Sequence, residues 1–235
     1  MNRYCAAIFL MFCTLTSHVS AMEEHEPNYI FFQAEQFEYR NQDGGDSLKW
    51  DAQGWYGGDD NKLWLKTEGE KPAGGKVEKA EIQALLSHRV TDFFDVQAGL
   101  RYDPEPNPRR SYAVLGLQGL APYYFETDAA LFLSNKGDLS ARFIAEYELL
   151  LTQKLILQPA MEINLAAQDV KALGIGVGVT DIELGLRLRY EIRREFAPYV
   201  GVNWERKLGQ TADLARGEGE DTEIPALVAG IRLWF

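Results

Sequence analysis

Cysteine, histidine and methionine, the residues that bind soft metal ions, are scarce in this chain. Its 235 residues include two cysteines, three histidines and four methionines. Both cysteines, Cys5 and Cys13, lie in a leading segment that we expect to be removed on export. The mature protein would therefore have neither disulfides nor thiolate metal ligands. Acylation at Cys13 is the alternative, and the bulky Phe12 before it disfavours a lipoprotein.

That leading segment has the composition of a secretory signal peptide. Asn2-Arg3 gives a positive start, an apolar run extends from Cys5 to Leu15, and Val19-Ser20-Ala21 supplies the small residues that a signal peptidase reads. We predict a signal peptide over residues 1–21 and a short periplasmic N-terminal tail over residues 22–29.

The chain also lacks a long apolar segment and an excess of basic residues. No later stretch approaches the about 20 apolar residues that a membrane-spanning helix needs, so a membrane-embedded form would have to be a β-barrel. The sequence has 24 Lys and Arg against 35 Asp and Glu. Nucleic acid is therefore not an expected partner, because phosphate binding needs a basic face. The acidic balance suits a cation-handling surface, and it also suits an ordinary secreted protein.

What the sequence does have is two-residue alternation of apolar and polar residues. From Ile182 to Ile192, leucine, isoleucine and Tyr190 alternate with charged residues and glycine. A strand separates these two sets onto two faces and a helix does not. Twelve such segments lie near residues 30–40, 48–57, 61–68, 76–89, 93–102, 110–120, 125–134, 139–151, 155–166, 181–192, 196–207 and 224–235. We predict an all-β fold, an antiparallel up-and-down transmembrane β-barrel of about 12 strands, over residues 30–235.

The connections between these segments alternate in length. Those after even-numbered strands are short, such as 58–60 and 152–154, and those after odd-numbered strands are usually longer, such as 167–180 and 208–223. Outer-membrane barrels have short periplasmic turns and longer external loops. The last segment ends on the aromatic Phe235, which is typical of such barrels. We expect the chain in a Gram-negative outer membrane, in contact with its lipid; a soluble sandwich or lipocalin-like barrel is the alternative.

Several longer segments carry a resemblance to a known family. They are Leu115–Tyr123, Tyr147–Pro159, Glu183–Tyr199, Trp204–Gly209, Thr211–Asp213 and Trp234-Phe235, and together they extend over about residues 28–235. They resemble the copper resistance protein B family, the outer-membrane components of bacterial copper-tolerance operons. The resemblance implies a barrel that contributes to copper resistance, with copper ions bound or transported and no organic cofactor. It also suggests a periplasmic copper oxidase or carrier as a candidate partner.

The chain departs from that family before the barrel. Many members carry a long Met- and His-rich repeat there, whereas this sequence has only Met22-Glu-Glu-His25 before Glu26. Met22, His25 and His88 are the candidate copper ligands, since copper sites draw on His and Met. The simpler interpretations are a solvated tail for Met22 and His25, and a structural residue for His88 on the outward face of its strand.

A second candidate site is the inward face of the barrel. Eight carboxylates fall on it and could form a path that attracts cations: Asp51, Glu81, Asp95, Asp128, Glu146, Glu162, Glu183 and Glu205. Basic residues share this face, including Lys49, Arg101 and Arg142. The alternative, which we favour on sequence alone, is a ladder of cross-strand ion pairs that fills and stiffens a narrow barrel.

We predict no catalytic activity. An outer-membrane lipid hydrolase is the enzymatic alternative, and it would need a Ser–His pair with an orienting group. Ser87 and His88 are neighbours in a predicted strand, so their side chains should point to opposite faces. The remaining alternative to copper passage is a structural barrel that docks a periplasmic copper-handling protein.

Overall fold

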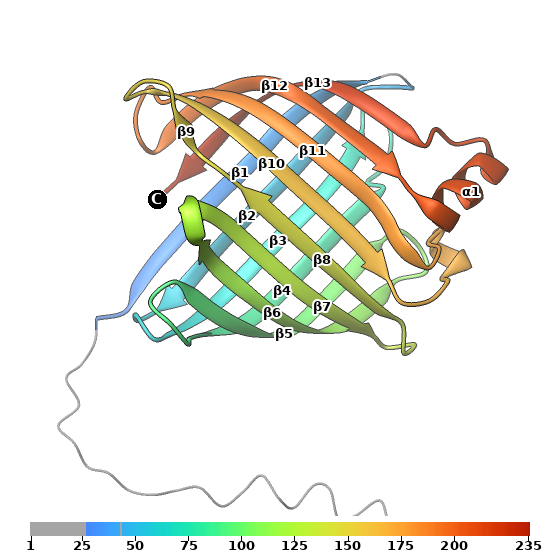
Figure 1. The fold of residues 1–235 in the computed structure, drawn as a ribbon, viewed down its shortest axis with the longest axis horizontal. Helices are drawn as coiled ribbons and strands as arrows, with labels where there is room; N and C mark the ends of the chain where they lie inside the picture. Colours follow the sequence, from blue (N-terminus) through green and yellow to red (C-terminus); the bar gives the residue numbers. More distant parts are fainter. Residues whose placement is uncertain (1–26, 43) are drawn as a thin grey trace, which may run out of the picture.

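The computed structural model describes residues 27–42 and 44–235. The predicted signal peptide (1–21) lies outside the described residues, as do Met22 and His25 of the predicted tail. Within the described ranges the chain forms a 13-stranded sheet (Figure 1). The strands are β1 (Tyr29–Gln42), β2 (Ser47–Gly57), β3 (Asn61–Pro72), β4 (Lys79–Arg89), β5 (Phe94–Glu105), β6 (Arg110–Ala121), β7 (Phe125–Ser134), β8 (Leu139–Glu146), β9 (Leu149–Leu150), β10 (Leu155–Ala166), β11 (Gly178–Tyr190), β12 (Phe196–Lys207) and β13 (Glu223–Trp234).

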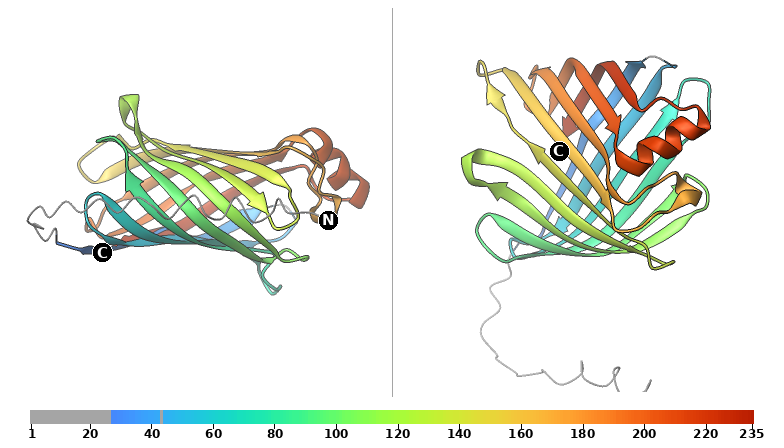
Figure 2. Two further views of the ribbon diagram at one scale, coloured as in Figure 1. Left: turned by 90° about the horizontal axis from the view of Figure 1, so that it is seen from below. Right: turned by 45° about the vertical axis from the view of Figure 1, so that its right-hand side comes forward.

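The sheet closes on itself as an antiparallel barrel. Consecutive strands pair around the ring, β1 pairs with β13, and β10 pairs with β11. Figures 1 and 2 show the closed wall and the strong tilt of its strands. The predicted fold is confirmed with its twelve strands, because β8 and β9 are two pieces of the single predicted segment 139–151.

The break between β8 and β9 has a cause in the neighbouring strand. β8 pairs with β10 up to Glu146 opposite Ala160, and β9 resumes with Leu149 opposite Leu157. Between them, the Tyr147 amide donates to the Pro159 carbonyl at 3.1 Å. Pro159 has no amide hydrogen with which to continue the ladder. The strand is therefore interrupted opposite this proline.

The two ends of the barrel differ in their connections. One end, here the short-turn end, holds tight turns such as 58–60 and the 3₁₀ helix η1 (Pro122–Tyr124), and β1 begins and β13 ends there. The other, the long-loop end, holds η2 (Lys171–Leu173) and the helix α1 (Gly209–Glu218). The alternation agrees with the sequence-based expectation, which missed α1. No helix among the described residues is long and apolar enough to cross a membrane.

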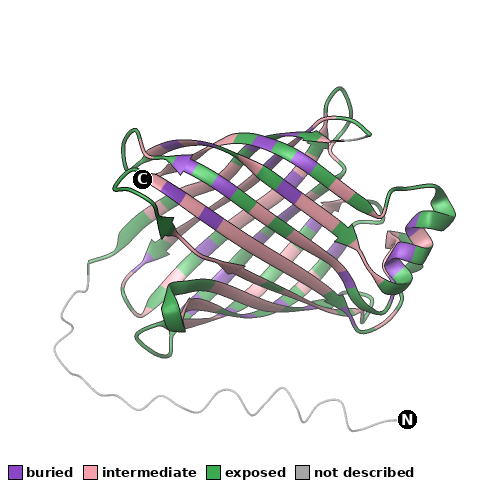
Figure 3. Ribbon diagram, turned by 45° about the horizontal axis from the view of Figure 1, so that its top comes forward, coloured by how far each residue is buried: buried purple, intermediate pink, exposed green. Residues whose placement is uncertain are grey.

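The barrel has apolar residues outside and charged residues inside. Leu86, Leu100 and Leu115 are 69%, 67% and 55% exposed on the outer face, whereas Glu38 and Arg40 are 0% and 2% exposed. Buried and exposed residues follow one another along the strands in Figure 3. A small apolar cluster of Trp64, Leu85, Val114 and Phe132 is buried inside. This arrangement matches a barrel whose outer band contacts lipid.

Candidate functional site

The eight predicted carboxylates lie on the inward face, where two cavities occupy the lumen. Asp51, Glu81, Asp128 and Glu146 line a cavity of about 420 Å³ toward the short-turn end. Glu81, Glu162, Glu183 and Glu205 line a second cavity, of about 490 Å³, toward the long-loop end. Asp95 accepts hydrogen bonds from Lys62 and Ser87, both at 3.1 Å, near the short-turn end. The structure therefore distributes these carboxylates along the lumen.

Most of these carboxylates are held by ion pairs from other strands. Glu183 of β11 contacts Arg40 of β1 at 2.7 Å and Lys49 of β2 at 3.3 Å. Arg40 also pairs with Glu38 at 2.8 Å, and Arg187 of β11 reaches Glu38 at 2.9 Å. Asp128 pairs with Lys66, and Glu205 with Lys79, at 2.7 and 3.8 Å. Ion pairs thus occupy a large part of the lumen, and, apart from Arg40–Glu38 within β1, the pairs named here join strands that are not neighbours in the sheet.

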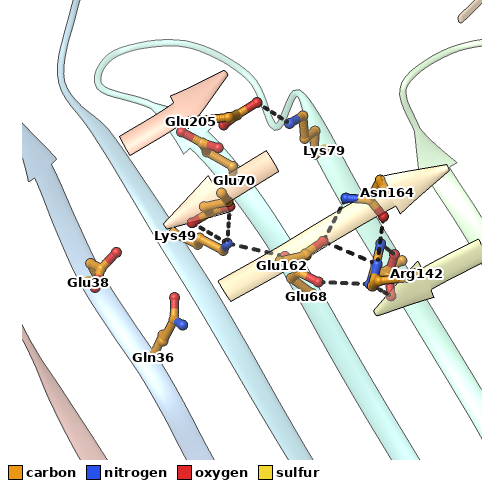
Figure 4. Close-up of polar contacts among 12 residues, drawn as sticks. Gln36, Glu38, Lys49, Glu68, Glu70, Lys79, Arg142, Glu162, Asn164 and Glu205 are labelled. Atoms are coloured by element: carbon orange, nitrogen blue, oxygen red, sulfur yellow. Dashed lines mark hydrogen bonds and ion pairs between the residues drawn. The ribbon is translucent and has the colours of Figure 1, made fainter. Parts of the chain in front are cut away.

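Arg142 of β8 makes the most extensive of these contacts. Its guanidinium lies 2.9 Å from Glu81. It also lies 3.2 Å from Glu68 and 3.3 Å from Glu162, as Figure 4 shows. The guanidinium carbon also lies 5.7 Å from the centroid of the Phe132 ring. β5, β6 and β7 separate β8 from β4 around the ring. The pairs of Arg142 with Glu68 and Glu81 therefore cross the lumen instead of joining neighbouring strands.

A second group of ion pairs lies toward the short-turn end. Arg232 of β13 pairs with Glu35 at 2.9 Å and with Glu148 at 3.3 Å, and Arg189 of β11 pairs with Glu148 at 2.6 Å. Gln158 joins the group by donating to Glu35 at 3.1 Å. This end of the lumen is therefore also bound together across several strands.

Among the described residues, several inward carboxylates have no such cation. Glu70 and Asp181 line the cavity toward the long-loop end, and three others line the cavity toward the short-turn end. Among residues 27–42 and 44–235, no salt bridge reaches Asp51, Glu126 or Glu146. Glu126 and Glu146 face each other on β7 and β8, an arrangement of like charges that destabilises a sheet unless something compensates it. All three line the cavity toward the short-turn end, which therefore holds acidic side chains without a basic partner among the described residues.

Several lumen residues were missed by the sequence analysis. Glu38, Arg40 and Glu68 fall on the same two-residue phases as their inward neighbours, so a stricter use of the alternation would have found them. Glu35 could not be found this way. The register of β1 shifts between Ala34 and Phe37, and a bulge of this kind changes which face the following side chains take.

The candidate copper ligands do not come together in the described part of the chain. His88 is exposed on the outer side of β4, with its Nδ1 2.9 Å from the Asn61 amide oxygen. Met22 and His25 lie outside the described residues. Within the described ranges no group of three or more His, Cys, Asp or Glu side chains is placed to hold a metal ion. Ser87 is buried and bonded to Asp95, on the opposite face from His88.

The comparisons with known proteins identify the family. Residues 28–235 match the family described as copper resistance protein B precursor. The chain belongs to the copper resistance protein B family. It is 45% identical to copper resistance protein B of Escherichia coli, covering 92% of this chain and 72% of that protein. It is 44% identical to a copper resistance protein B homolog of Pseudomonas syringae pv. tomato, covering 94% and 74%. The matched region of this family coincides with the barrel.

Solved structures of outer-membrane porins share the fold. The NanC porin superimposes with a TM-score of 0.57 and 11% sequence identity, over 87% of this chain and 99% of the porin. The KdgM porin gives a TM-score of 0.52 at 11% identity, with the same coverages. At this level of identity the likeness establishes the porin-like barrel of this copper resistance protein B family member and nothing about its cargo.

Proposed function

We propose that this barrel lies in the outer membrane and contributes to copper resistance by admitting copper ions to its acidic lumen and passing them across. The family membership supports the connection with copper, and the porin-like fold supports the membrane. Outer-membrane barrels have their short turns in the periplasm and their longer loops outside the cell. The short-turn end would therefore face the periplasm and the long-loop end the exterior. Copper is here the transported ion, and no catalytic step is proposed.

The observation that carries the proposal is the unmatched acidity of the cavity toward the short-turn end. Asp51, Glu126 and Glu146 line it without a salt bridge to any described residue. Clustered carboxylates within low-dielectric walls attract cations and lower the barrier to their entrance. Carboxylate oxygens suit Cu(II) poorly compared with imidazole. Weak, multiple contacts of this kind favour passage over tight storage.

A docking role is the second candidate, and one feature of the short-turn end favours it. Tyr123 and Tyr124 of η1 are 83% and 75% exposed, and both have left-handed backbone conformations, with φ of 67° and 66°. Non-glycine residues in this conformation are uncommon, and two in sequence mark an unusual turn. A turn with two exposed aromatic rings could contact a periplasmic copper oxidase or carrier.

Growth of bacteria in copper separates the two proposals. The lumen variant Asp51→Asn/Glu126→Gln/Glu146→Gln replaces three acidic side chains by neutral amides without removing the salt-bridge partner of any described basic residue. The turn variant Tyr123→Ser/Tyr124→Ser leaves the lumen unchanged. Asp213→Asn, on the exposed surface of α1, is the matched control. The strains are compared at equal amounts of folded barrel in the outer membrane. Copper passage predicts that only the strain with the lumen variant grows poorly in copper, and docking predicts this only for the strain with the turn variant.

A further inference from the structure

The two lumen cavities share one group of lining side chains. Glu68, Glu81, Phe132 and Arg142 line both the cavity toward the short-turn end and the cavity toward the long-loop end. These four residues, here called the partition, therefore lie where the two cavities meet. They come from strands on different parts of the ring: β3, β4, β7 and β8.

The partition is braced from both sides of the lumen. Arg142 reaches across from β8 to Glu68 and Glu81, while Arg101 of β5 holds the same Glu81 at 2.7 Å. Arg101 and Arg142 both lie over the Phe132 ring, at 4.8 and 5.7 Å from its centroid. The Arg142 and Glu81 side chains are 15% and 8% exposed. Two guanidinium groups, a shared carboxylate and a shared ring thus hold one another in place.

We propose that Arg142, with Glu68, Glu81 and Phe132, forms the constriction that restricts the passage of small ions through this lumen and sets its ion selectivity. A cation that moves along the lumen meets the fixed positive charge of Arg142, and an anion meets the carboxylates on either side of it. An ion can cross only where Arg142 has left Glu68 and Glu81. The constriction acts on any small ion, so it goes beyond the proposed passage of copper.

Potassium conductance in planar lipid bilayers tests the constriction without copper. We expect a low conductance for the unsubstituted protein and an increase of about tenfold or more for Arg142→Gln, equivalent to about 1.4 kcal/mol of barrier. The open variant should prefer potassium over chloride, because Glu68, Glu81 and Glu162 then lack their shared cation. Arg187→Gln is the matched control, since it removes a buried lumenal arginine that lines neither cavity. Equal conductance of the Arg142→Gln and unsubstituted barrels would overturn the proposal.

Thiol labelling tests the same partition in the protein with Arg142 intact, in case the Arg142→Gln barrel does not fold. Gln118→Cys places a thiol in the cavity toward the short-turn end, and Ser140→Cys places one in the cavity toward the long-loop end. The unsubstituted protein, with no cysteine after Cys13, is the blank. A small charged thiol reagent that cannot cross lipid should label each cysteine only from its own end. Labelling of Gln118→Cys from the long-loop end would overturn the partition.

These outcomes are distinct from those of the proposed function. If Arg142→Gln raises the potassium conductance but the lumenal carboxylates make no difference to copper resistance, the constriction is supported and copper passage is refuted. If those carboxylates are needed for copper resistance but the conductance is the same with and without Arg142, copper passage is supported and the constriction is refuted.

Discussion

Replacing Glu38 by Gln tests whether the lumenal ion pairs stabilise the barrel. Glu38 is fully buried between Arg40 and Arg187, at 2.8 and 2.9 Å. In the variant, Arg40 keeps the Glu183 carboxylate at 2.7 Å, whereas Arg187 keeps only neutral hydrogen-bond acceptors such as Gln36 at 3.3 Å. The change therefore leaves one buried arginine without a carboxylate. Breaking a single buried pair in this way costs about 3–5 kcal/mol.

The free energy of unfolding can be measured by urea titration of the barrel in lipid vesicles, with tryptophan fluorescence as the signal. Arg216→Ala is the control, because it removes a surface pair with Asp213 in which both side chains are more than half exposed. Exposed pairs of this kind contribute about 0.2–1 kcal/mol. A loss for Glu38→Gln no larger than that of the control would refute the view that the charged lumen stabilises the fold.

Two further substitutions test the packing of the wall and the direction of its faces. A Cβ at Gly99 would lie 2.1 Å from the Ala84 carbonyl oxygen, so Gly99→Ala should destabilise the barrel by about 1–3 kcal/mol in the same titration; an unchanged midpoint would show that β4 and β5 are not so closely apposed. Leu115→Arg, in the middle of β6 on the outer face, should cost about 2–4 kcal/mol in vesicles, and a neutral result would contradict its placement against lipid.

The sequence predicted the wall of the barrel well, because the strands follow a two-residue pattern over most of their length. The positions of the twelve strands and the inward phase of Glu81, Glu162 and Glu183 needed only that local periodicity. The pattern cannot show a bulge, so Glu35 was missed where the register of β1 shifts. The break opposite Pro159 and the helix α1 were missed for a related reason, since both depend on interactions with other segments.

The contacts across the lumen lay beyond sequence reasoning. Alternation places Arg142 and Glu81 on the inward face, and it does not say that they meet from opposite parts of the ring. Those contacts depend on the number of strands, their tilt and the stagger of the closed sheet. The partition at Arg142, the acidic cavity toward the short-turn end and the ion pairs of Arg189 and Arg232 therefore became visible only in three dimensions.

Copper flux into liposomes tests the central claim most directly. The barrel is inserted into vesicles that contain a copper-sensitive dye, and magnesium uptake is followed in parallel. The proposal predicts copper uptake above that of protein-free vesicles, and a marked decrease on Asp51→Asn/Glu126→Gln/Glu146→Gln. Copper uptake equal to that of protein-free vesicles, with the barrel shown to be folded, would contradict passage through the lumen.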